Sequence, residues 1–192
     1  MDMSEAAATA PARRHSAWAL GCGLLTLILA ATALLLPVID WAPRGGVVGW
    51  LLFLAGLAEL AFGLRHRPGP VGNAATGAGL ITAAAGLLFI VQPFAHFFRV
   101  ADVVMAWLFV RGAWMLVAAL RMRGIRPVKW VALSGTADLL LGLALVAGLP
   151  VAAFVISLFG PTPELVASFA LILAASFLAT GFAQVAIARD SP

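Results

Sequence analysis

The chain has 192 residues, of which 63% are hydrophobic and only 10% are charged, and its mean hydropathy is +1.06. A soluble domain carries about 25% charged residues, so this composition leaves too little polar surface to cover a water-soluble globule. The formal net charge of +4 does not indicate nucleic-acid binding, because the basic residues flank apolar segments, where they act as topology signals. The single cysteine, Cys22, excludes an internal disulfide and a multi-cysteine metal site.

Residues 1–16 are small and polar and end in a basic group. We expect them to form a short disordered tail in the cytoplasm. A cleaved signal peptide is the competing interpretation. We favour an uncleaved chain, because the apolar run over residues 17–36 exceeds the usual signal-peptide core of about 7–15 residues and lacks a polar cleavage region.

Six apolar segments follow, each close to the ~20 residues that span a bilayer. Spans in lipid must be helical, because every backbone polar group needs a partner within the segment. The segments are approximately 17–36, 47–64, 74–91, 100–120, 130–149 and 165–188. The stretch Val151–Phe159 is too short to span alone, so it either continues the fifth helix past a proline or lies at the interface. The expected fold is an all-α integral membrane protein with one six-helix domain over residues 17–189.

The connections between the segments differ in charge. On one side of the membrane they carry nearly all the basic residues: Arg13, Arg14, Arg65, Arg67, Arg121, Arg123, Arg126, Lys129 and Arg189. The other side has only Arg44 and Arg99, accompanied by acidic residues. The positive-inside rule then places both termini in the cytoplasm. We therefore expect a multi-pass protein of the plasma (inner) membrane.

The first helices of three successive hairpins share a pattern. Each has a glycine followed by a proline fourteen or fifteen residues later: Gly23 with Pro37, Gly79 with Pro93, and Gly135 with Pro150. A small residue stands seven positions after each glycine: Ala30, Gly86 and Gly142. Seven residues make two helical turns, so each pair lies on one helix face. Small residues allow neighbouring membrane helices to approach closely, so we predict packing roles for Gly23, Gly79, Gly86, Gly135 and Gly142.

The second helices of the hairpins repeat as well. A small residue precedes a cytoplasmic arginine by nine positions in each: Gly56 before Arg65, Gly112 before Arg121, and Thr180 before Arg189. The sequence thus predicts three two-helix hairpin repeats, over residues 17–67, 74–123 and 130–189. Because each hairpin enters and leaves on the same side, the repeats would be parallel, about an axis along the membrane normal.

Three ionisable residues lie within the predicted spans: Glu59, Arg111 and Asp138. A charge at the centre of a membrane helix costs about 2.5–3.5 kcal/mol, so such residues usually face the bundle interior and pair. Counted from the cytoplasmic helix ends, Arg111 and Asp138 lie ~13 and ~12 Å deep, and Glu59 ~7 Å. One interpretation is a structural ion pair of Arg111 with Asp138, with Glu59 reaching toward Arg65 or Arg67. The other is a proton-sensitive or proton-conducting centre.

Other candidate sites are few. His96, in an aromatic stretch at the outer interface, could titrate as the external pH falls, although we favour an interfacial histidine in an aromatic collar. The sequence has no phosphate-binding loop, no metal-ligand spacing and no Ser/His/Asp set in one plausible pocket. We therefore expect no enzyme activity, no cofactor and no metal.

The sequence resembles the HdeD-type acid-resistance membrane proteins. The resemblance rests on the three Gly-x-x-[Thr/Asp]…Pro first helices and the Gly…Arg second helices, with Gly135-Thr136-Ala137-Asp138 matching the Gly-x-x-Asp of the family's fifth helix. It covers essentially residues 17–189. The third hairpin departs from the pattern, since Pro150 to Arg189 is eleven residues longer than Pro37 to Arg65 or Pro93 to Arg121. The resemblance implies an inner-membrane protein of the acid-stress response and no particular molecular mechanism.

Three functional hypotheses follow. The first is a non-enzymatic acid-stress membrane protein, as the resemblance implies. The second is a small proton-coupled transporter or channel centred on Glu59, Arg111 and Asp138. The third is an assembly or scaffold subunit. The expected surroundings are the lipid bilayer and no nucleic acid, and the sequence leaves a homo-oligomer or a membrane partner protein open.

Overall fold

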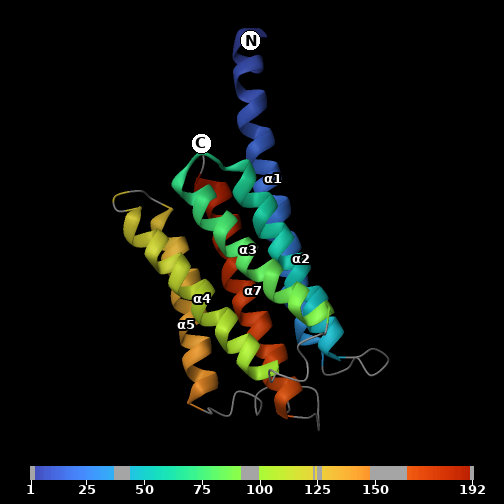
Figure 1. Cartoon of the computed structure of the whole chain (residues 1–192). Helices are drawn as coiled ribbons and strands as arrows, with labels where there is room; N and C mark the ends of the chain where they lie inside the picture. The colour runs from blue at the N-terminus through green and yellow to red at the C-terminus, as the bar shows by residue number, and fades with distance from the viewer. Residues whose placement is uncertain are drawn as a thin grey trace.

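The computed structural model of the chain describes residues 3–36, 44–91, 100–122, 124, 127–147 and 164–190. All secondary structure within those ranges is helical (Figure 1). The helices are α1 (Met3–Leu34), α2 (Arg44–Arg65), α3 (Pro70–Val91), α4 (Val100–Arg121), α5 (Val128–Val146) and α7 (Glu164–Asp190). Each contains an apolar stretch of 18 to 22 residues, close to the ~20 that cross a bilayer. The fold is that of a multi-pass, all-helical membrane protein.

Helix α1 differs from its predicted span at the N-terminal side. Its apolar stretch begins at Ala17, as the sequence predicts, but the helix itself begins at Met3, where the sequence predicts a disordered tail over residues 1–16. These residues are rich in alanine, which has the highest helix propensity, and extending an existing helix costs far less than nucleating one. The first turns of α1 therefore project beyond the other helices (Figure 1).

Two features singled out in the sequence lie outside the described residues. They are His96 and the segment Val151–Phe159.

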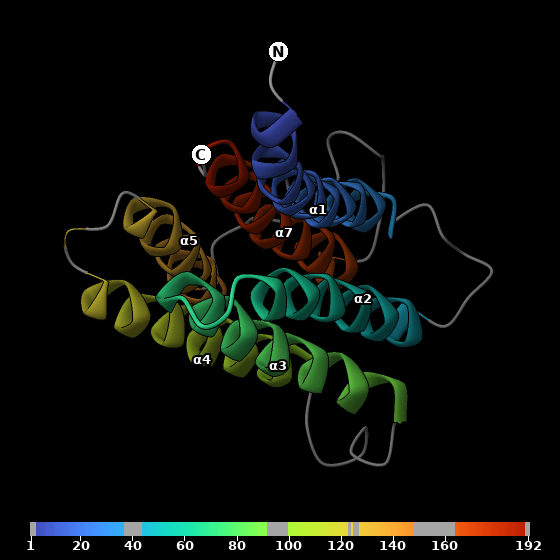
Figure 2. The same ribbon diagram turned by 90° about the horizontal axis from the view of Figure 1, so that it is seen from above.

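Each helix packs against its neighbours in chain order, and α7 packs against α1, so that the six helices close into a ring (Figure 2). The most extensive contacts join α2 to α3, α1 to α7, and α4 to α5. In terms of the predicted hairpins, these are contacts between one hairpin and the next. The two helices within a hairpin contact each other less.

Glycine pairs lie at the three most extensive contacts. The pairs are Gly23 with Gly181, Gly79 with Gly56, and Gly135 with Gly112. A β-carbon on the first member of each pair would lie 3.2, 2.9 and 3.0 Å, respectively, from the carbonyl oxygen of the second. Gly86 has the same role farther along α3, where a β-carbon would lie 2.3 Å from the backbone nitrogen of Phe53. A β-carbon on Gly142 would lie 3.2 Å from the ring of Phe109. These backbones approach closely because glycine has no side chain.

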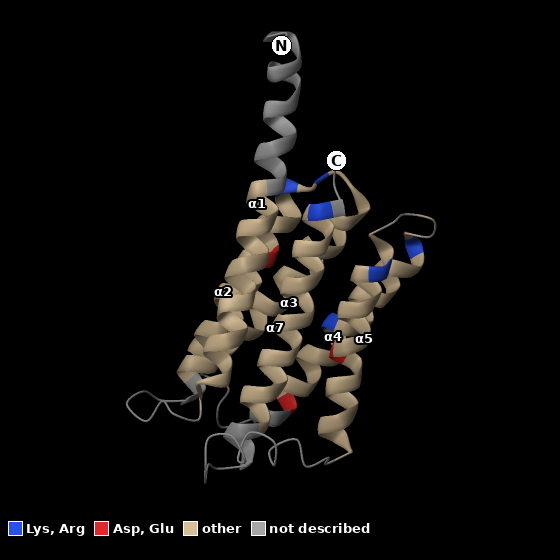
Figure 3. Ribbon diagram, turned by 180° about the vertical axis from the view of Figure 1, so that it is seen from behind, with Lys and Arg blue, Asp and Glu red and all other residues tan. Residues whose placement is uncertain are grey.

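Apart from the buried Arg111, the described basic side chains gather at one end of the bundle, which we call the arginine end (Figure 3). Among the described side chains it carries Arg65, Arg67, Arg121, Lys129 and Arg189. The acidic side chains lie deeper in the bundle or toward its other end (Figure 3). This is the charge asymmetry on which the predicted orientation rests.

The apolar core is distributed unevenly along the bundle. In the half away from the arginine end, a single cluster joins α1, α2, α3, α4 and α7, and it includes the fully buried Leu52, Leu108 and Leu173. We call this half the apolar half. In the half nearer the arginine end the core divides. One part surrounds Phe62 and Ile187, and the other surrounds Met115.

Candidate functional site

The three ionisable residues of the predicted spans meet at the centre of the bundle, on three different helices. Glu59 of α2, Arg111 of α4 and Asp138 of α5 have relative exposures of 3%, 2% and 0%. The Arg111 guanidinium contacts both carboxylates. Its Nη2 lies 2.9 Å from Glu59 Oε1, and its Nη1 donates to Asp138 Oδ2. The sequence-based expectation of an Arg111–Asp138 pair on adjacent helices therefore agrees with this geometry.

Glu59 pairs with Arg111. The structural interpretation of the sequence, in which Glu59 reaches toward Arg65 or Arg67, is therefore wrong on this point. Arg111 Nε donates to Glu59 Oε2 at 3.4 Å in addition to the Nη2 contact, so the guanidinium holds this carboxylate with two donors. Arg65 and Arg67 are exposed at the helix end. The buried carboxylate takes the buried cation because neither group can reach water.

Helix α7 surrounds the ionic cluster with hydroxyl groups. Ser176 Oγ donates to Asp138 Oδ1 at 2.6 Å. Thr180 Oγ1 accepts a hydrogen bond from Arg111 Nη2 at 2.8 Å and donates to the Ser176 carbonyl at 2.9 Å. Ser134 of α5 lies 3.4 Å from the Thr180 hydroxyl. Arg111 and Asp138 thus each have a neutral partner as well as an ionic one, whereas Glu59 is bonded to Arg111 alone. A buried ion cluster needs such additional hydrogen bonds if it is not to destabilise the bundle.

Two further polar contacts lie at positions that repeat in the sequence. Thr26, Thr82 and Asp138 each follow the packing glycine of their helix by three residues, and all three are buried. The Thr26 hydroxyl shares its one hydrogen between the Cys22 carbonyl at 3.0 Å and Gln184 Oε1 at 3.2 Å. Thr82 accepts a hydrogen bond from Trp107 Nε1 at 3.1 Å. The third position of the motif therefore carries a polar side chain into the bundle in all three first helices.

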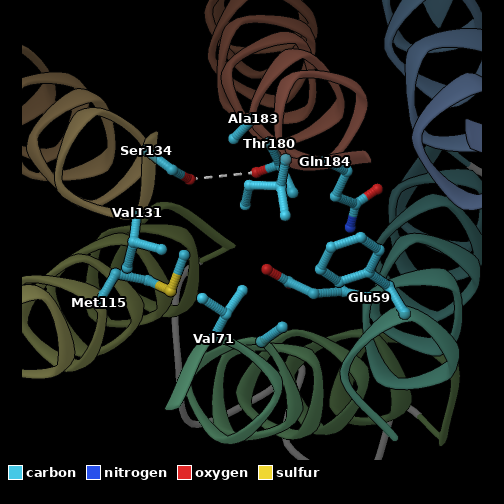
Figure 4. Close-up of a pocket in the computed structure, with 11 residues that line it drawn as sticks. Glu59, Val71, Met115, Val131, Ser134, Thr180, Ala183 and Gln184 are labelled. Atoms are coloured by element: carbon cyan, nitrogen blue, oxygen red, sulfur yellow. Dashed lines mark hydrogen bonds between the residues drawn. The ribbon is translucent and has the colours of Figure 1, made fainter. Parts of the chain in front are cut away.

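A small cavity lies beside the ionic cluster, toward the arginine end. The space open to the centre of a water molecule in it is about 20 Å³, and one water needs roughly 10–15 Å³ on this measure. Of the two carboxylates, Glu59 lines the cavity and Asp138 does not. Figure 4 shows Glu59 reaching from α2 into the middle of this space, with Thr180 and Gln184 reaching toward it from α7. The remaining lining is mostly apolar.

The ionisable groups of the cluster do not balance in charge. The cluster contains two carboxylates and one guanidinium, so its formal charge is −1 when all three groups are ionised and zero when one carboxyl group is protonated. Within the described residues, no group of three or more His, Cys, Asp and Glu side chains is placed to hold a metal ion.

The sequence interpretation missed the contribution of α7. Ser176, Thr180 and Gln184 are spaced four residues apart, which places them on one helix face, and all three are buried. Such a polar stripe on an otherwise apolar helix is a signal that the sequence contains. It can be recognised as part of the site only when Arg111 and Asp138 are known to face it.

Comparison with known proteins gives one match. Residues 77–147, which cover most of α3 and all of α4 and α5, match a family model described as a short repeat of unknown function (DUF308). No curated protein and no solved structure matches the chain.

Proposed function

We propose that this chain is a non-enzymatic protein of the inner membrane that acts in the acid-stress response, as the HdeD-type proteins do. Three observations support the proposal. The six helices are suited to a bilayer. Residues 77–147 match the short-repeat family to which the HdeD-type proteins belong. The Gly-x-x-[Thr/Asp] motif of the first helices, on which the resemblance rests, carries its polar residue into the centre of the bundle in each case.

The link to acid rests on the composition of the buried cluster. One guanidinium is paired with two carboxylates in a region without access to bulk water. An uncompensated charge inside a membrane protein is costly, and uptake of one proton removes it. The cluster would therefore change its net charge from −1 to zero as the pH falls, which makes it the proton-sensitive element of the proposed function.

We infer that the three hairpins are parallel repeats. The ring of contacts and the three glycine pairs support this arrangement, because each pair joins the second helix of one hairpin to the first helix of the next around the ring. The Gly23–Gly181 pair closes the ring between α7 and α1. An axis along the membrane normal would then pass through the polar centre. We also infer that both termini are cytoplasmic, on the basis of the basic residues at the arginine end.

A proton-coupled transporter centred on the same three residues is the alternative. It would need access to the cluster from both sides of the membrane in turn. The apolar half is filled by a single cluster of buried apolar side chains, and this observation favours a proton-sensitive protein over a transporter. The third hypothesis, a scaffold subunit, is supported only by the close packing of the helices.

Acid survival tests the proposal. A host strain lacking the gene would be complemented with the parent, with Asp138→Asn, with Glu59→Gln, or with Leu80→Ile, an exposed control. We expect the parent and the control to restore survival in acid, and the two carboxyl variants to reach normal membrane levels without restoring it. Restoration by both carboxyl variants would show that the cluster is purely structural. Failure of the parent would reject the acid-stress assignment.

A further inference from the structure

The amide of Gln184 is the least satisfied polar group near the cavity. Its Oε1 accepts a hydrogen bond from Thr26, but its Nε2 is buried without a hydrogen-bond partner among the described atoms. The residue has a relative exposure of 3% and lines the cavity beside Glu59. A buried polar group without a partner costs about 1–3 kcal/mol, and such a group in a native fold usually marks a bound water or ligand.

We propose that the cavity binds one water molecule, held between Gln184 and Glu59, and that this water delivers the proton to the Glu59 carboxylate. The inference rests on the proposed proton-sensitive function. It identifies Glu59 as the group that accepts the proton and the bound water as the path by which the proton arrives. The space of about 20 Å³ accommodates a single water, which also needs two to four polar partners. Gln184 Nε2 donates to it, and a free lone pair of the Glu59 carboxylate accepts from it.

Ser134 supplies a third partner. Thr180 already donates its only hydroxyl hydrogen to the Ser176 carbonyl, so in the Ser134–Thr180 contact at 3.4 Å the hydrogen comes from Ser134. The Ser134 oxygen then has lone pairs free to accept from the water, and its side chain lines the same cavity (Figure 4).

The two carboxylates differ in their access to this water. Asp138 has one oxygen bonded to Arg111 and the other to Ser176, and it does not line the cavity. Glu59 has both oxygens bonded to Arg111 alone, so each retains a lone pair directed elsewhere. Glu59 is therefore the member of the cluster that takes up the proton.

The charged groups around Glu59 are few. Arg111 of α4 contacts it directly, and Asp138 of α5 lies on the far side of the same guanidinium. Among the described side chains, α1 and α3 carry no charged residue, and α7 carries only Arg189 near its end. When a hydronium ion reaches the site, its proton moves to a Glu59 oxygen and a neutral water remains. The net charge of the cluster then rises from −1 to zero.

Hydrogen–deuterium exchange at the Glu59 carboxyl group tests the proposal. The full chain in lipid nanodiscs, held at acid pH, would be transferred to D₂O, and the protonated-carboxyl infrared band that Glu59→Gln abolishes would be followed in time. Gln184→Leu should slow its exchange by about tenfold, the ratio expected for the loss of one ordinary hydrogen bond to the water. Met115→Leu, which lines the same cavity without a polar group, should exchange at the parent rate.

Isotopically labelled water provides a second measurement in the parent itself. A buried water gives a sharp O–H stretching band that shifts with the label. We expect this band in the parent and in Met115→Leu, and its absence in Gln184→Leu.

Equal exchange rates in Gln184→Leu and the parent, or no buried-water band in the parent, would overturn the proposal. If Gln184→Leu does not fold, the exchange rate of Gln184→Met and the buried-water band of the parent test the proposal instead. None of these outcomes bears on acid survival, so the water site can fail while the proposed function stands. Loss of the carboxyl band in Asp138→Asn, with its retention in Glu59→Gln, would contradict only the choice of carboxylate.

Discussion

The two halves of the bundle, on either side of the Glu59–Arg111–Asp138 cluster, are packed differently. The apolar half has one core cluster joining five helices. The half at the arginine end has two separate clusters, with the cavity between the helices that form them. The residues that line the cavity include members of both clusters, such as Phe62 and Met115. The core is thus continuous on one side of the charges and divided on the other.

Under the proposed function, this difference would let the bundle respond to protons from one side. A continuous apolar core excludes water and insulates the cluster. A divided core leaves space for a water molecule next to Glu59. Glu59 lies six residues before Arg65, at the arginine end of α2. The polar atoms of Ser134, Thr180 and Gln184 all face this space (Figure 4). Proton access is therefore expected from the arginine end alone.

The largest expected loss of stability comes from removing the cation of the cluster that separates the two halves. Arg111→Leu removes the single cation and leaves two buried carboxylates without compensation, which should cost about 3–5 kcal/mol of unfolding free energy. The triple variant Arg111→Leu, Asp138→Leu and Glu59→Gln has no uncompensated charge and should be more stable than Arg111→Leu alone. Unfolding by SDS in detergent micelles measures both. A triple variant that is less stable than the single one would contradict the charge-balance account.

The next largest effect is the difference in stability lost when one apolar side chain is truncated in each half. Leu108 is fully buried in the apolar half, and Leu108→Ala should cost about 2–5 kcal/mol, because a tightly packed core cannot collapse around the space left. Met115 lies beside the existing cavity. Met115→Ala should cost no more than about 2 kcal/mol, the lower limit for such truncations, since the enlarged space can be hydrated by neighbouring polar groups. The same SDS titration measures both, and equal losses would mean that the halves do not differ in packing.

A smaller effect is expected at a helix contact that joins the two halves. A β-carbon on Gly79 would lie 2.6 Å from the backbone nitrogen of Leu60, so Gly79→Leu should force α2 and α3 apart at a cost of about 1–3 kcal/mol. Leu80, its neighbour, is 57% exposed, and Leu80→Ile should change stability by less than about 0.5 kcal/mol. Thermal unfolding in detergent compares the two. Similar melting of both variants would show that Gly79 is not at a helix contact.

The sequence predicts the number, position and type of the helices well, because spanning a bilayer imposes length and apolarity on every segment. It also predicts that Arg111 and Asp138 meet, since residues at equal depth on adjacent antiparallel helices have few other partners. It fails at residues 3–16, where alanine content favours extension of α1 over disorder.

The missed part of the site belongs to α7 and to the cavity. Which face of α7 points to the cluster depends on how the ring closes between α7 and α1, and no local pattern specifies that closure. The structural interpretation of the sequence directs Glu59 toward Arg65 or Arg67, whereas the structure pairs it with Arg111. Depth along a helix does not give rotation about its axis, so the sequence cannot choose between these partners. The cavity is a consequence of packing among several helices, so its presence follows only from the assembled fold.

The central claim is that the buried cluster takes up one proton in acid and that Glu59 receives it. Infrared titration of the full chain in nanodiscs, from neutral to acid pH, tests this claim most directly. The parent should develop one protonated-carboxyl band that is assigned to a buried group by its slow exchange in D₂O. Removal of either carboxylate leaves one carboxylate opposite one guanidinium, so the band should be absent in Glu59→Gln, and Asp138→Asn should lose it as well. A parent without such a band, or a band of unchanged size in Glu59→Gln, would contradict the account.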